Sequence, residues 1–211
     1  MVLGRFREDA DAGKAPVLVV PTTADRDAYE AELLEDGALI GGKVLTWERF
    51  VRDLARRTNV EGRVIGPIRR GLLAREVVRD AVEEGRLAAL ADSAASPGFP
   101  EAFERLVLEH SRGLMTNEQL LELPAGGNRA RADETVALVK RYFDKLSDGE
   151  VLDRDLQARS ALNALRDDPT QWSGEPVLFY GFADLTALQA GVIATLASVA
   201  EVTVSLPTES D

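Results

Sequence analysis

The chain has 211 residues, of which 45% are hydrophobic, and this suits one domain or a small domain that carries an insertion. It contains no cysteine, which excludes disulfides and thiolate metal sites within the chain, and its single histidine, His110, argues against a histidine-based zinc site. The formal net charge of -11 repels nucleic acid, so any DNA contact requires a local basic patch. No apolar run is long enough for a bilayer span or a signal peptide, so we expect a cytoplasmic protein without membrane contact.

Two short strands are predicted near the start of the chain. Residues 15–21 read APVLVVP, a continuous apolar run that is typical of a strand covered on both faces. Residues 43–47 read KVLTW and follow a Gly-Gly turn signal. Both runs are short enough for strands of a parallel sheet.

Helices are expected before, between and after these strands. The first ends at Gly13, the second is capped by Thr22 or Thr23 and continues to Leu34, and the third begins behind Thr46. The resulting order, helix–strand–helix–strand–helix, indicates a parallel sheet with crossover helices.

The middle of the chain is expected to be all helical. From Gly66 to about Asp168 there is no strand signal, and Thr116 and Gln119 form a predicted capping box. The helical patterns cover residues 68–90, 102–114, 131–146 and 154–165, with loops at 93–100 and 124–128.

Strand signals return at residues 176–182 and 201–207, and a helix with a Thr186–Gln189 capping box is expected between them. The sequence therefore predicts an α/β domain made of residues 1–65 and 171–211, which is interrupted by a helical insertion at residues 66–170.

Motifs for catalysis are missing from this pattern. Two of the four lysines, Lys14 and Lys43, follow a glycine, but Ala15 and Val44 stand where a phosphate-binding loop needs Ser or Thr. No lysine has an acidic residue two positions before it, as a magnesium-dependent nuclease requires. We expect His110 to be a partly exposed helix residue, and we predict no catalytic residue, metal ligand or cofactor in this chain.

One run of the sequence is strongly basic. Residues 49–79 contain nine arginines and only three acidic residues. Arg49, Arg52 and Arg56 lie on one helical stripe opposite Phe50 and Leu54. Such a stripe binds phosphates or an acidic partner, and the alternative is a solvated face that the acidic remainder of the chain neutralises.

Four segments resemble the N-terminal part of the AddB family, the B subunit of AddAB-type helicase–nucleases. They are also similar to the first motor-like domain, 1A, of superfamily 1 (UvrD-like) helicases. The segments read VLVVPTTADRDAYEAEL (17–33), GKVLTWERFVRDLARR (42–57), VLFYGFADLTALQ (177–189) and EVTVSLPTE (201–209). The resemblance implies a RecA/P-loop-NTPase-like parallel sheet with a 1B-like helical insertion. Its phosphate-binding strand and loop would precede residue 1, so the sheet would lack its P-loop strand.

The resemblance also implies a DNA-binding site. Thr22, Thr23, Thr46 and Trp47 occupy places that contact single-stranded DNA in active relatives, and the ring of Trp47 would stack on a base. The alternatives from the residues themselves are that the threonines cap their helices and that Trp47 anchors the core.

The magnesium-binding strand of active helicases looks degenerate in this chain. Where those enzymes read Asp-Glu-x-Gln-Asp, this chain has Tyr180 and Gly181 in place of the first Asp and the Glu, and only Asp184 remains. A phenol is no substitute for a carboxylate ligand, and glycine has no side chain to position water. We therefore expect Asp184 to be a turn or cap residue.

The function implied by the resemblance is a non-catalytic, helicase-like module in DNA double-strand break processing and recombinational repair. The parent protein would be an ATP-dependent helicase and exonuclease subunit. The module would bind DNA, either a single strand or a duplex end, or an AddA-like partner subunit. The alternatives are a protein-interaction scaffold without DNA contact and a truncated NTPase.

Overall fold

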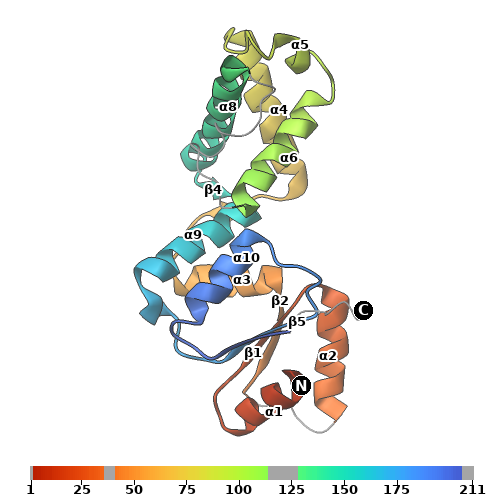
Figure 1. The fold of residues 1–211 in the computed structure, drawn as a ribbon, viewed down its shortest axis with the longest axis vertical. Helices are drawn as coiled ribbons and strands as arrows, with labels where there is room; N and C mark the ends of the chain where they lie inside the picture. Colours follow the sequence, from red (N-terminus) through yellow and green to blue (C-terminus); the bar gives the residue numbers. More distant parts are fainter. Residues whose placement is uncertain (1, 36–40, 114–127, 206–211) are drawn as a thin grey trace. The chain divides into compact units, whose positions relative to one another are not determined.

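The computed structural model describes residues 2–35, 41–113 and 128–205 (Figure 1). The chain divides into two compact units, one made of Met1–Glu61 and Gln157–Asp211 and the other of Gly62–Leu156. The boundaries expected from the sequence, after residues 65 and 170, assign residues 157–170 to the helical part instead. The second boundary lies inside helix α9 (Arg154–Asp167), where no change in composition marks it.

The first unit, here called the α/β unit, contains a four-stranded sheet in the order β2-β1-β5-β6. Every neighbouring pair in it is parallel, which confirms the predicted α/β fold and makes it compatible with a Rossmann-like arrangement. In the central strands, Val19 lies between Leu45 on one side and Phe179 on the other. The strands are β1 (Val17–Val20), β2 (Lys43–Thr46), β5 (Val177–Tyr180) and β6 (Val202–Ser205).

Helices cover both faces of this sheet (Figure 1). On one face, α1 (Val2–Asp11) and α2 (Thr23–Glu35) bury Phe6 and Leu33 in a cluster with strand residues. On the other lie α3 (Trp47–Arg57) and α10 (Ala187–Leu196). Right-handed crossovers explain this, because α2 and α10 connect strands in opposite directions from the centre of the sheet and so lie on opposite faces.

The predicted helix caps of the α/β unit are present. The Thr46 hydroxyl accepts a hydrogen bond from the Arg49 amide at 3.4 Å, and Thr186 forms a capping box with Gln189. Of the two candidates for the start of α2, Thr22 is the cap, because its hydroxyl accepts from the Asp25 amide at 3.1 Å.

The second unit, here called the helical unit, departs from the sequence prediction in two places. The helix expected over residues 68–90 ends at Glu83, because Gly85 adopts φ +68° and turns the chain. The unit also contains two paired strands of two residues each, β3 (Arg63–Val64) and β4 (Val151–Leu152), which are too short to give a periodic signal. The main helices are α4 (Pro67–Glu83), α5 (Ala91–Ala94), α6 (Phe99–Arg112) and α8 (Arg129–Asp148).

Two further predictions for this unit concern the start of α6 and the segment that follows it. Helix α6 begins at Phe99, inside the expected loop at 93–100, since Pro100 is favoured in the first turn of a helix. The Thr116–Gln119 capping box and residues 124–127 of the expected loop lie outside the described residues.

His110 is buried, with 4% of its surface exposed, so the prediction of a partly exposed residue was wrong. Its ring packs beside Phe143 of α8 with the ring centroids 5.8 Å apart. Tyr142, also from α8, is fully buried in the same unit and meets Phe103 edge to face. The histidine therefore belongs to the aromatic core of the helical unit.

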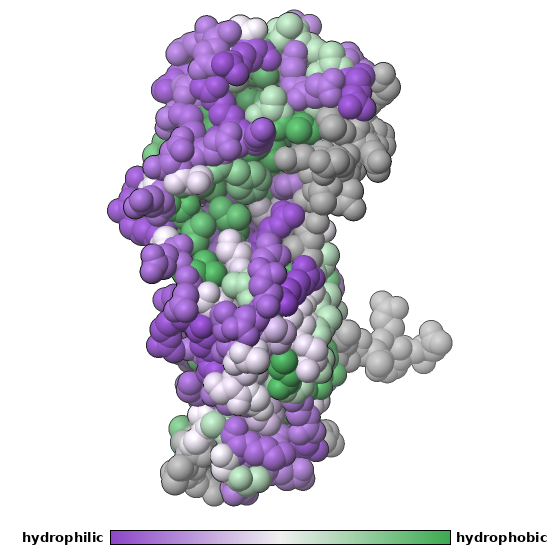
Figure 2. Space-filling model, turned by 90° about the vertical axis from the view of Figure 1, so that its left-hand side faces the viewer, coloured by the Kyte–Doolittle hydropathy of each residue, from purple (hydrophilic) through white to green (hydrophobic). Residues whose placement is uncertain are grey.

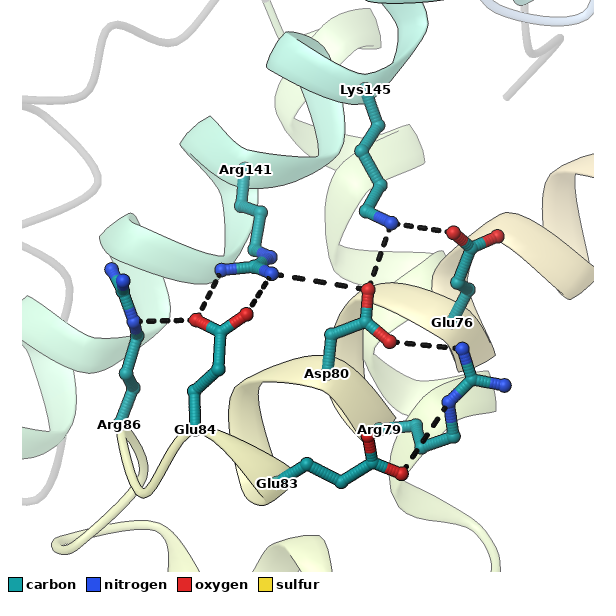
Figure 3. A network of polar contacts seen from close by, with 8 residues as sticks. All are labelled: Glu76, Arg79, Asp80, Glu83, Glu84, Arg86, Arg141 and Lys145. Atoms are coloured by element: carbon teal, nitrogen blue, oxygen red, sulfur yellow. Dashed lines mark hydrogen bonds and ion pairs between the residues drawn. The ribbon is translucent and has the colours of Figure 1, made fainter.

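An ion-pair network joins α4 to α8 (Figure 3). The acids Glu76 and Asp80 of α4 and Glu84 directly after it follow one another at intervals of four residues, and Arg141 and Lys145 do so on α8. Lys145 lies 2.8 Å from Asp80, and Arg141 forms two hydrogen bonds with Glu84. Each of these three acids is thereby paired with a cation of α8.

The surface drawn in Figure 2 is mostly hydrophilic, and hydrophobic residues show there in separate patches. Among the described residues, the most exposed large hydrophobic side chains are Ile68 (84% exposed) and Leu72 (58%), both on α4. Their spacing of four residues places them on the same side of that helix.

Candidate nucleic-acid interface

The carboxyl ends of β1 and β5 form the topological switch point of the sheet. The chain leaves β1 toward β2 and leaves β5 toward β6, so the two connections diverge from neighbouring strands. Ligands of open α/β sheets usually bind in the crevice at this place. Thr22 and Thr23 follow β1 and Gly181 follows β5, while Thr46 and Trp47 lie at the end of β2 on the same edge. The structure thus brings the residues implied by the resemblance to one edge.

Two tyrosines pack against each other at this edge. The ring centroids of Tyr29, on α2, and Tyr180, at the end of β5, lie 5.1 Å apart. Burial, followed by the proximity of Tyr180, raises the pKa of the Tyr29 hydroxyl above its ordinary value. The Tyr29 hydroxyl is therefore neutral at physiological pH, and Tyr180, the position that the resemblance compares with a metal-binding carboxylate, holds a packed aromatic ring.

Gly181 and Asp184 do not complete a magnesium site. Gly181 adopts φ +82°, and a Cβ built on it would lie 3.6 Å from Cδ of Pro21. Asp184 is exposed in a bend, and since Thr186 caps α10, Asp184 is a turn residue and not the cap. A phenol, a glycine and one exposed carboxylate do not match the oxygen ligands that Mg²⁺ requires. Within residues 2–35, 41–113 and 128–205, no group of three or more His, Asp or Glu side chains is placed to hold a metal ion.

The threonine hydroxyls at this edge take part in capping. The Thr22 hydroxyl, besides its capping bond, donates to the Asp25 carboxylate at 2.6 Å. Thr46 is only 8% exposed, and its hydroxyl accepts from the Arg49 amide. Thr23, the first residue of α2, is exposed. The capping alternative thus describes Thr22 and Thr46.

Trp47 is half-buried at the start of α3. Its ring centroid lies 5.9 Å from that of Phe50, which is fully buried in the core. The indole therefore packs on the core through part of its surface, and the rest is exposed at the carboxyl edge.

A groove with a volume of about 520 Å³ lies between α3 and the edge strand β2. Arg49, Arg52 and Arg56 are exposed and line it from α3, as the helical stripe predicted. The groove is lined by Lys43, Leu45, Arg49, Arg52, Asp53 and Arg56. It therefore combines four cationic side chains with one carboxylate, and we call it the α3 groove.

Lys43 also belongs to this site, although from the sequence we considered it only as a candidate phosphate-loop lysine. The signal was present in the strand pattern. In β2, Val44 and Thr46 are buried, while Lys43 is exposed and Leu45 is partly so. Alternation of side chains along a strand places Lys43 and Leu45 on the face that α3 covers.

The positive charge of the α3 groove is only partly neutralised. Asp53 pairs with both Arg56 and Arg57, and Arg52 lies 3.9 Å from Glu48. Among the described residues, Lys43 and Arg49 have no ion-pair partner within 4.0 Å. Phosphate contacts by these two side chains would not require an existing ion pair to break.

The arginines farther along the basic run are placed differently. Arg70 pairs with Glu104 at 2.8 Å, Arg75 with Glu101 at 2.5 Å and Arg79 with Asp80 at 2.9 Å. All three pairs lie within the helical unit. For these three residues the neutralised-face alternative holds, whereas the α3 stripe keeps cations that are available to a ligand.

Comparison with models of known protein families gives no match, and comparison with curated proteins gives none either. No helix in the described part of the chain is both long and apolar enough to cross a membrane.

Proposed function

We propose that this chain is a non-catalytic, helicase-like module that binds DNA within an AddB-type subunit of a break-processing helicase–nuclease. The observation that carries the proposal is the α3 groove. In a chain with a net charge of -11, it gathers four cations, and two of them have no acidic partner among the described residues. A local basic patch of this kind is what DNA contact requires of an acidic protein.

The absence of catalysis is supported by the residues at the switch point. Tyr180 packs on Tyr29 where a metal-binding carboxylate would be needed, and Gly181 adopts a backbone conformation that disfavours a glutamate. These residues oppose the alternative of a truncated NTPase. The four-stranded parallel sheet supports the proposed kinship with domain 1A.

The test is a titration of a labelled single-stranded oligonucleotide with the 211-residue chain, followed by fluorescence anisotropy at low and at moderate salt. We expect saturable binding that weakens steeply as salt increases, because phosphate contacts release counterions. A chain that leaves the anisotropy unchanged at low salt has no DNA-binding role of its own, and the proposal is then wrong.

A second candidate function is subunit binding, and the exposed apolar side chains of α4 favour it. Ile68 and Leu72 place two large hydrophobic groups in solvent on one side of that helix. An AddA-like partner is the proposed occupant. Sedimentation of the chain mixed with such a subunit tests this. If the interface buries these side chains, the double variant Ile68→Glu with Leu72→Glu should abolish the complex. If the double variant still forms the complex, the interface lies elsewhere on the chain.

A further inference from the structure

We infer that the α3 groove holds the sugar–phosphate backbone of single-stranded nucleic acid, with Lys43 as its fourth phosphate-binding cation. The inference rests on the proposed function and assigns a place and a chemical class to the DNA contact. It also moves the main contact away from the threonines at the carboxyl edge, whose hydroxyls at Thr22 and Thr46 serve as helix caps.

The spacing of the cations suits a chain of phosphates. Along α3, Arg49 and Arg52 are separated by about 4.5 Å of helix rise, and Arg52 and Arg56 by about 6 Å. Steps of this size are comparable to the distance between neighbouring phosphates of a single strand. Lys43 faces the three arginines from β2, so a strand in the groove would meet cations on two sides.

The four cations differ in how far existing ion pairs already neutralise their charge. Lys43 and Arg49, which have no acidic partner among the described residues, can bind phosphate at no cost in broken pairs. Arg52 has a long contact of 3.9 Å to Glu48, which is easily exchanged for a phosphate. Arg56 competes with Arg57 for Asp53, so its charge is the most neutralised of the four.

Two apolar side chains favour a single strand over a duplex. Leu45 lines the groove, and the half-buried ring of Trp47 lies at the start of the helix that carries the arginines. Unpaired bases can lie on such apolar and aromatic surfaces, and stacking contributes about 1–3 kcal/mol per base in known single-strand sites. A duplex turns its phosphates outward and keeps its bases stacked inside, so it would leave Leu45 and Trp47 unused.

The decisive experiment compares two pairs of substitutions with the same loss of charge. The groove pair is Lys43→Gln with Arg49→Gln, and the control pair is Lys140→Gln with Arg69→Gln. The control residues are exposed in the helical unit and have no ion-pair partner there or elsewhere in the described residues. All chains are titrated against the same labelled single strand over a salt series, and circular dichroism confirms that each is folded.

Four phosphate contacts predict a slope of about -2.8 for log K against log salt concentration, since each contact on a single strand contributes about -0.7. The groove pair should reduce the size of this slope by about 1.4 and weaken binding at low salt by about tenfold or more. The control pair should leave the slope unchanged.

Asp53→Asn is a variant that should bind the single strand more tightly than the wild-type chain. It removes the one carboxylate that lines the groove and frees Arg56, so the affinity should rise severalfold. Arg57 keeps its partner Glu175 in this variant. Misfolding would lower affinity, so tighter binding has to come from the groove.

The outcomes separate the inference from the proposed function. If the wild-type chain binds the single strand but the groove pair behaves like the control pair, the inference is wrong and the DNA contact lies elsewhere. If the wild-type chain does not bind at low salt, the proposed function fails together with the inference. Equal affinity for a duplex of the same length, or displacement of the strand by polyglutamate of matched charge, overturns the single-strand assignment.

Discussion

Tyr29 and Tyr180 pack ring against ring at the carboxyl end of β5, with their ring planes inclined by 51°. The pair joins α2 to β5, the strand that our proposal compares with the magnesium-binding strand of active helicases. The two aromatic rings contribute packing at this point, where a carboxylate would contribute charge. The tyrosine at position 180 is therefore part of the packed structure of this edge.

Introducing a carboxylate at this strand should destabilise the chain. Tyr180→Asp removes a half-buried ring from the contact with Tyr29, and we expect a loss of about 1–3 kcal/mol in the free energy of unfolding. Urea denaturation measures it. Tyr180→Phe, which keeps the ring, is the matched control and should cost no more than about 1 kcal/mol. Equal losses in both variants would contradict the role of the ring.

Gly181 should resist even the smallest side chain. Because its φ is +82°, Gly181→Ala should lower the free energy of unfolding by about 1 kcal/mol. The control is Gly4→Ala, since Gly4 lies within α1 with open space around its Cβ position. That change should stabilise the chain by about 0.5–1 kcal/mol. Effects of the same sign at both positions would show that backbone conformation is not the cause.

Asp9 should make the stability of the α/β unit sensitive to acid. Burial raises the pKa of this carboxyl, but hydrogen bonds from Lys14 and Arg5 outweigh burial and bring the pKa below its ordinary value. A group with a lowered pKa stabilises the folded state above its unfolded pKa of about 4, and this contribution disappears as the pH falls through the folded value.

The measurement is urea denaturation of the wild-type chain and of Asp9→Asn between pH 7 and pH 3. We expect the wild-type chain to be the more stable at pH 7 and the difference to shrink below about pH 4. Glu8→Gln is the control, because Glu8 is exposed on the same helix. A difference that stays constant down to pH 3 would disprove the acid sensitivity of Asp9.

Asp80 should be the most important acid of the network between α4 and α8. It lies 2.8 Å from Lys145, 2.9 Å from Arg79 and 3.9 Å from Arg141, and the hydrogen bonds from Lys145 and Arg79 lower the pKa of its carboxyl (Figure 3). Asp80→Asn should therefore lower the melting temperature more than Glu83→Gln, whose carboxylate meets only Arg79 in this network.

The size of this difference should depend on salt, because exposed ion pairs are screened. Melting curves at low and at high sodium chloride concentration measure it, and the gap between the two variants should narrow at high salt. If the gap persists at high salt, the effect of Asp80 comes from packing and not from charge.

Much of the α/β unit could be predicted because its elements follow local rules. The continuous apolar run at residues 15–21 indicated a strand covered on both faces, a strand was also expected at residues 176–182, and these two strands, β1 and β5, form the centre of the sheet. Thr46 and Thr186 cap helices as their positions indicated, since capping depends on residues only three positions away. Local chemistry of this kind is fully present in the sequence.

The rest depends on residues that are distant in sequence. His110 reads as a surface residue of α6, and only its partner Phe143 on α8 explains its burial. Lys43 becomes part of a site because β2 is an edge strand beside α3, and strand order cannot be read from one strand alone. The partners that neutralise Arg70 and Arg75 also come from another helix. Pairwise contacts across the fold decide these three cases.

Arg57, directly after Arg56 at the end of α3, has a different environment from the three arginines that line the groove. The guanidinium of Arg57 lies 4.2 Å above the ring of Trp172 and forms two hydrogen bonds with the Glu175 carboxylate. It thereby clamps the last turn of α3 to the segment that leads into β5. A ligand of the groove would meet cations whose backbone is already fixed, so little conformational entropy is lost in ordering that helix. The clamp makes the α3 groove a preorganised surface, and Arg57 would influence ligand affinity through this rigidity as well as through the Asp53 carboxylate that it shares with Arg56.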